Sequence, residues 1–161
     1  MPERFFLSGW LIALLVLFPA TLTAAEISLS PLNPGRGDHL EVAVVIDDVA
    51  SLAGVKLVLT YDPNILVYTE GRKTAESQSM MHVVNDRTPG RLIIVMACAR
   101  GISGRNLPIM NLAFALKNKK SDRRSIRIDL VEVQLMSDQL KDISCKLVNK
   151  NLDFSLPPSV K

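Results

Sequence analysis

Side chains that could carry out chemistry are few in this chain, and they are scattered. It holds two cysteines, Cys98 and Cys145, and two histidines, His39 and His82. None of them stands in a Cys-x-x-Cys pair or a Cys/His cluster, the spacings that metal sites use. A nucleophile elbow, a glycine-rich phosphate loop and a nucleic-acid-binding motif are also missing from the sequence. The sequence therefore predicts a protein that is not an enzyme, holds no metal or cofactor and binds no nucleic acid.

The stretch "GVKLVLTYDPN" at residues 54–64 changes abruptly from strand formers to turn formers. Successive side chains of a strand point to opposite faces. One face would carry Val55, Leu57, Leu59 and Tyr61, and the other Gly54, Lys56, Val58 and Thr60. Pro63 cannot donate to a sheet, and Asp62 and Asn64 can bond nearby backbone amides. This pattern predicts a strand with one buried face that ends at a structural corner.

The N-terminus has the order of a secretory signal peptide. Arg4 precedes an apolar run at residues 7–18, and small residues follow at 20–25. The run is shorter than the ~20 residues that span a bilayer, which argues against a membrane anchor. We therefore expect residues 1–25 to be a signal peptide and residues 26–161 to form a single domain. The mature protein would be periplasmic, cell-surface or secreted, without stable insertion in a membrane.

Export bears on the two cysteines, because an oxidising compartment permits disulfides. A bridge between Cys98 and Cys145 is one prediction, and two buried free thiols are the alternative. The formal net charge of +3 is small and indicates at most a weak preference for anionic partners. Basic residues gather at 117–127, a run that could attract an anionic polysaccharide or lipid headgroups, or form a solvated loop.

Short strand-forming segments recur along the rest of the chain, with turn residues between them. We expect strands at residues 26–30, 40–48, 54–61, 65–68, 80–84, 91–98, 109–116, 125–135 and 144–154. Residues 69–79 are polar and fit a loop or a short helical turn. No long segment has the 3.6-residue apolar period of a helix. The spacing predicts an all-β fold, a β-sandwich or jelly roll.

Four blocks follow one another in an order that resembles a cohesin domain. They are "LEVAVVIDDVASLAGVKLVLTYDPNIL" at 40–66, "GRLIIVMACA" at 90–99, "LPIMNLAFALK" at 107–117 and "IRIDLVEVQLMSD" at 126–138. Cohesins are receptor modules that bind dockerins in cellulosomes and on some bacterial surfaces. The resemblance implies a nine-stranded jelly-roll β-sandwich with residues 61–64 as a framework corner. It also implies a non-catalytic interaction module whose partner is a dockerin-like or other extracytoplasmic protein.

In cohesins one sheet face receives the dockerin, with contributions from the third, fifth, sixth and eighth strands. Many cohesins place Asn and Asp where this sequence has Gly54 and Lys56, and an acidic residue near the position of Arg100. By strand alternation, the resemblance assigns partner binding to Lys56, Val58, Thr60, Ile94, Met96 and Arg100. That surface would be an apolar strip with basic residues at its edges. The departures predict a divergent, non-cellulosomal cohesin with a partner unlike a standard dockerin.

Two other functions fit the same architecture. The first is a carbohydrate-binding module, since sugar-binding jelly rolls share this fold. Sugar platforms usually rely on aromatic rings, but the only tryptophan, Trp10, lies in the predicted signal peptide. Composition therefore favours a protein partner over a polysaccharide. The second is a structural subunit of an envelope or secretion assembly, which the sequence does not separate from an interaction module.

Overall fold

The computed structural model describes residues 24–32, 39–117 and 126–148 of the 161-residue chain. Nearly all of the predicted signal peptide lies outside these residues, as do most of the basic run and the end of the last expected strand. Every regular element of the described residues is a strand, so none of them contains a helix that could cross a membrane.

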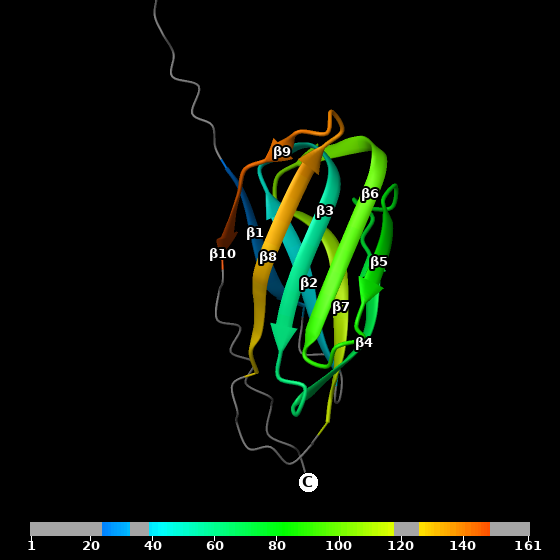
Figure 1. The fold of residues 1–161 in the computed structure, drawn as a ribbon, viewed down its shortest axis with the longest axis vertical. Coiled ribbons are helices and arrows are strands. Elements are labelled where there is room, and N and C mark those ends of the chain that lie inside the picture. The colour runs from blue at the N-terminus through cyan, green and yellow to red at the C-terminus, as the bar shows by residue number, and fades with distance from the viewer. Residues whose placement is uncertain (1–23, 33–38, 118–125, 149–161) are drawn as a thin grey trace, which may run out of the picture.

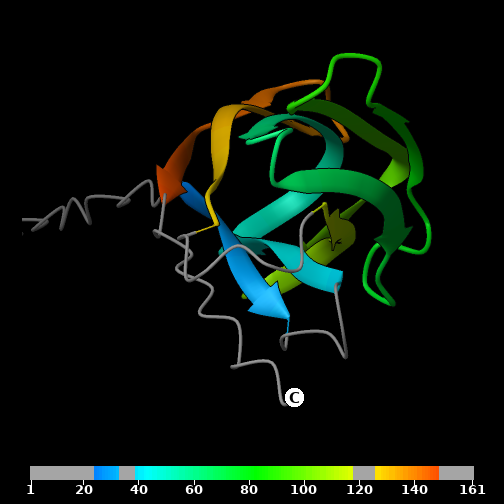
Figure 2. The same ribbon diagram turned by 90° about the horizontal axis from the view of Figure 1, so that it is seen from below.

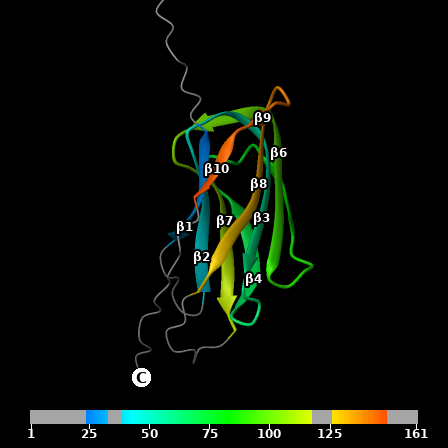
Figure 3. The same ribbon diagram turned by 60° about the vertical axis from the view of Figure 1, so that its left-hand side comes forward.

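The strands form two five-stranded sheets that face each other (Figures 1 and 3). In order across the first sheet lie β10 (Cys145–Val148), β1 (Ala25–Leu32), β2 (His39–Asp47), β7 (Leu107–Leu116) and β4 (Leu66–Lys73). In order across the second lie β5 (Met81–Asn85), β6 (Arg91–Gly104), β3 (Val49–Tyr61), β8 (Ile128–Ser137) and β9 (Asp142–Ile143). Neighbouring strands are antiparallel except β1 and β10, which run parallel. The predicted β-sandwich is confirmed, with ten strands in place of nine because the two-residue β9 precedes β10.

The core lies between the two sheets, whose ribbons enclose it when seen from one end (Figure 2). Inward side chains of nearly every strand are buried, as the apolar alternation predicts. Phe114 is fully buried at the centre of an aromatic cluster. The rings of Tyr61 and Tyr68 pack edge-on against it, with centroids 5.2 and 5.9 Å away. These aromatic rings therefore serve packing.

The corner after β3 has the geometry that its residue types predict. The backbone N–H of Asn64 donates to Oδ1 of Asp62 at 2.8 Å, and that of Leu66 donates to the carbonyl of Asp62 at 2.9 Å. Asp62 thus closes the turn with both its side chain and its backbone, while Pro63 leaves no N–H unpaired. The corner brings the chain from the second sheet into β4 of the first.

The loop between β4 and β5 is fastened to the first sheet by two hydroxyl groups. β4 pairs with β7 only as far as Met110, so the carbonyls of Pro108 and Ile109 lie beyond its end. The hydroxyl of Thr74 donates to the first carbonyl at 2.5 Å, and that of Ser77 to the second at 2.6 Å. The polar segment predicted at 69–79 thus begins as strand and then caps the sheet.

Replacing the buried Ser77 by Ala leaves the carbonyl of Ile109 without its hydroxyl donor. We expect Ser77→Ala to lower the free energy of unfolding by about 1–3 kcal/mol, which is the cost of leaving a buried polar group unsatisfied. Ser79→Ala, at an exposed position of the same loop, is the matched control and should change stability by about 0.5 kcal/mol or less. Urea titration followed by circular dichroism measures both, and equal midpoints would contradict the capping role.

Candidate functional site

The central strand of the second sheet, β3, has one buried and one outward face. Val55, Leu57 and Leu59 are at most 3% exposed and belong to the core. Alternation therefore directs Lys56 and Thr60 away from the core, as the sequence predicts. Figure 1 looks onto this outer face, where β6, β3 and β8 lie side by side.

On β6 the prediction of the outward residues is wrong by one position. Ile94 and Met96 are buried in the core and are at most 1% exposed. Cα partners in a sheet share a face, and the partner of Lys56 on β6 is Val95. The outward residues of β6 are therefore Ile93, Val95 and Ala97. Because both alternating sets of this strand are apolar, hydrophobic alternation alone does not distinguish its two faces.

Arg100, predicted at the edge of the site, lies in a wide bulge near the end of β6. Gly54 pairs with Ala97 and Leu52 with Ile102, so four residues of β6 stand opposite Ala53 alone. The bulge fits closely against β3, because a Cβ on Gly101 would lie 2.3 Å from the carbonyl carbon of Ser51. Arg100 is exposed there and is not part of the flat face.

A bulge in β8 decides which of its residues join the outer face. Val58 pairs with Glu132 and Leu59 with Leu130, so Val131 is the extra residue. Leu130 and Leu135 are buried, whereas Val131 and Glu132 both escape the core. Without the bulge, the alternation that buries Leu130 would also place Glu132 inside.

The outer face of the second sheet, called the outer face below, is largely apolar. Its successive rows, read from β8 through β3 and β6 to β5, are Met136–Gly54–Ala97–Met81, Gln134–Lys56–Val95–Val83 and Glu132–Val58–Ile93–Asn85, followed on the first three strands by the polar row Asp129–Thr60–Arg91. The described residues include seven large exposed hydrophobic side chains, and five of them belong to this face: Met81, Val83, Val95, Val131 and Met136. Such a concentration on one sheet face is typical of an interaction surface.

An ion pair lies in the middle of the outer face. Nζ of Lys56 is 2.6 Å from Oε1 of Glu132, and each side chain is 41% exposed. Glu132 is the ladder partner of Val58, so the pair runs diagonally from one row to the next. Val58 points outward but is only 1% exposed between these neighbours. The sequence predicts Lys56 as a charged residue at the edge of the site. In the structure Lys56 lies at the centre of the face and its charge is neutralised by Glu132.

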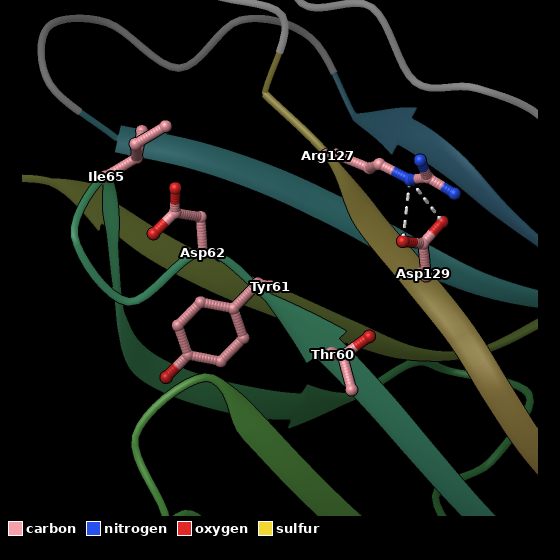
Figure 4. A pocket seen from close by; sticks show the side chains of 6 residues that line it. All are labelled: Thr60, Tyr61, Asp62, Ile65, Arg127 and Asp129. Atoms are coloured by element: carbon pink, nitrogen blue, oxygen red, sulfur yellow. Dashed lines mark hydrogen bonds and ion pairs between the residues drawn. The ribbon is translucent and has the colours of Figure 1, made fainter.

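An open hollow at the far end of β3 holds the other group of polar side chains (Figure 4). Nε of Arg127 lies 3.0 and 2.7 Å from the two carboxylate oxygens of Asp129, and Asp62 already accepts the Asn64 N–H. Both carboxylates are therefore engaged in local structure. The described residues contain no group of three or more His, Cys, Asp or Glu side chains able to hold a metal ion.

Both cysteines are free thiols, so the candidate disulfide is not formed in this structure. Cys98 lies on β6 in the second sheet, and Cys145 lies on β10 at the edge of the first. The Cys98 thiol donates to the carbonyl of Arg100 at 2.9 Å. Burial raises the pKa of both thiols above the usual value for cysteine.

Several outward residues were missed by sequence reasoning although the sequence held signals for them. Arg91 is exposed at the start of β6 and shares its face with Ile93 and Val95. Alternation counted from this charged residue would have identified the outward side chains of the strand. On β8, Asp129 and Glu132 are three positions apart where regular alternation requires an even spacing. That odd spacing is the signature of the bulge.

Of three comparisons with known proteins, the one with solved structures finds matches, and these show the fold alone. The sequence matches no family model and no curated protein. Among solved structures, a non-cellulosomal cohesin from the archaeon Archaeoglobus fulgidus aligns with a TM-score of 0.64 at 17% identity, over 78% of this chain and 86% of that one. The sixth cohesin of Acetivibrio cellulolyticus scaffoldin B, in complex with a Cel5 dockerin mutant, gives 0.66 at 17% identity, over 79% and 96%.

A type II cohesin domain of the Acetivibrio cellulolyticus cellulosome aligns with a TM-score of 0.61 at 13% identity, over 79% of this chain and 93% of that one. The chain has the cohesin fold. The fold that the four sequence blocks imply is thereby confirmed, at sequence identities of 13–17%. The alignments span most of each solved domain, so the two-sheet architecture is shared as a whole.

The phase of β6 can be tested by truncating neighbouring side chains. Met96→Ala should lower the free energy of unfolding by about 2–5 kcal/mol, because it opens a cavity in the core. Val95→Ala should cost about 1 kcal/mol or less, because Val95 is nearly half exposed. Urea unfolding measures both variants, and a larger loss for Val95→Ala would reverse the assigned faces.

Thiol chemistry tests the state of the cysteines. Denatured, unreduced protein should titrate two free thiols per chain. In the folded protein the raised pKa values leave less thiolate at neutral pH, so alkylation should be slower than for free cysteine and should accelerate as the pH rises through the raised pKa. Iodoacetamide labelling followed by mass spectrometry measures the alkylation rates. If the denatured protein has no free thiols, the two cysteines form the disulfide after all.

Proposed function

We propose that this domain is a non-catalytic module that docks another extracytoplasmic protein through its outer face. The observation that carries the proposal is that five of the seven large exposed hydrophobic residues in the described part of the chain lie on that one face. The expected signal peptide at residues 1–25 supports a partner outside the cytoplasm.

The fold comparison supports the same class of function. The scaffoldin B cohesin was solved with a dockerin, as was the OlpA cohesin from Clostridium thermocellum, which aligns with a TM-score of 0.66 at 14% identity over 78% of this chain and 95% of that one. A dockerin-like protein is therefore the first partner to test. An envelope or secretion protein is the second, because the same face would serve a structural subunit.

The chemistry of the outer face points to an apolar contact surface on that partner. Lys56 and Glu132 neutralise each other, and Arg127 does the same for Asp129 in the last row of the face. A half-exposed pair such as Lys56–Glu132 contributes only about 0–1 kcal/mol to folding. Held in place, however, it lets the centre of the face lose water without leaving a charge unpaired. We expect aliphatic side chains of the partner to cover Val95 and Met136.

A sugar ligand is less well supported by the surface. Tyr61, Tyr68 and Phe114, the aromatic residues of the described chain, form one cluster packed on the core. The rows of the outer face contain no aromatic ring among the described residues. Flat stacking on a pyranose ring therefore has no platform there.

Affinity capture from the exported proteins of the source organism tests the proposal when it is run with three baits. The unchanged protein and Val67→Asp, an exposed hydrophobic of β4 on the first sheet, should retain the same partner. Val95→Asp should lose it, because it places a carboxylate in a contact that excludes water. A central position implies a loss of affinity of about 30-fold or more, measured by calorimetry on the captured protein.

A charge swap serves as the control for the ion pair. Lys56→Glu alone sets two carboxylates together and should weaken binding, whereas the double change with Glu132→Lys rebuilds the pair and should recover it. Circular dichroism establishes that each variant is folded. Retention of the partner by a folded Val95→Asp protein would exclude the outer face, and the identity of the partner separates a dockerin-bearing protein from an envelope subunit.

A further inference from the structure

The edge of the second sheet at β5 is open and apolar. β5 bonds to β6 on one side, and no strand of the described residues borders its other side. Met81 and Val83 are 78% and 68% exposed, more than any other hydrophobic residue within a described strand. An unpaired row of backbone N–H and C=O groups next to exposed apolar side chains is a template for another strand.

The other sheet edges of the described residues are protected, and β5 is not. The edge strand β4 carries the exposed residues Glu70 and Arg72, whose side chains pair at 3.3 Å. The edge strand β9 has only two residues and includes Asp142, and the described part of β10 carries Lys146. Charges and short length are the usual devices against edge pairing. The sequence of β5, "MHVVN", contains no Asp, Glu, Lys, Arg or Pro.

We propose that β5 pairs with β5 of a second copy of this chain, in an antiparallel ladder centred on Val83. This register is self-complementary, as a two-fold dimer requires. Val83 meets the partner's Val83, and Met81 meets the partner's Asn85. Beyond the strand, Asp86 meets the partner's Met80 and Arg87 meets the partner's Ser79. No like charges face each other along the ladder, and the two second sheets become one continuous sheet.

The dimer is a weak one. A ladder of two five-residue strands buries less than the ~1,200 Å² at the low end of stable interfaces, which places this dimer among weak, transient ones. Such pairing leaves the outer face of both copies open. Met81 and Val83 belong to both surfaces, but dimer formation is measured without a partner and docking is tested at Val95, so either proposal can fail without the other.

Analytical ultracentrifugation without any partner tests the pairing on protein expressed from the full-length sequence. Over a range of about 5–500 µM the unchanged protein should pass from monomer to dimer. Val83→Lys should remain monomeric, because a lysine on the edge blocks strand addition. Val131→Lys, exposed on the same face but on β8, should dimerise as the unchanged protein does. An unchanged protein that stays monomeric, or a dimeric Val83→Lys variant, overturns the proposal.

Cross-linking tests the register. Directly opposed residues in an antiparallel ladder have Cα atoms ~4.5–5.5 Å apart, within the range of disulfides. Diamide should therefore link Val83→Cys to its own copy and give a covalent dimer on a non-reducing gel, while Val131→Cys and the unchanged protein, with its two free cysteines, should not. Equal cross-linking of all three, or none in Val83→Cys, overturns the ladder centred on Val83.

Discussion

Burial of Val55, Leu57 and Leu59 inside the sandwich is the constraint on which the outer face depends. β3 lies between β6 and β8 and pairs with both along most of its length. Because paired residues share a face, the inward and outward residues of β3 determine those of its neighbours. The core thereby dictates which residues of three strands reach solvent. The apolar surface outside is a consequence of how the inside is packed.

Sequence reasoning succeeded where one face of a strand differs in character from the other. β3 alternates a uniformly apolar set with Gly54, Lys56 and Thr60, so its phase could be predicted. On β6 both sets are apolar, and placing Ile94 and Met96 outside was an error that the charge of Arg91 could have prevented. On β8 the bulge is a backbone event, visible in the sequence only as the odd spacing of Asp129 and Glu132. The fold followed from strand and turn spacing, which neither of these two local ambiguities changes.

The two proposed contacts use one sheet in different ways. The outer face offers side chains, and its central pair, Lys56 and Glu132, is already neutral before a partner arrives. The β5 edge offers backbone, and its lack of charge makes it available to a strand of like sequence. Joining two copies at that edge would present two outer faces side by side. A partner with two contact surfaces could then gain avidity that a single copy cannot supply.

The bulge at Val131 also makes the outer side of β8 independent of its core side. Its extra residue lies on the outer side, so deleting Val131 would leave Ile128, Leu130, Val133 and Leu135 facing the core and Glu132 facing outward. A one-residue deletion elsewhere in β8 would reverse every side chain after it. A residue of the outer face can therefore be gained or lost at this place without any compensating change in the interior.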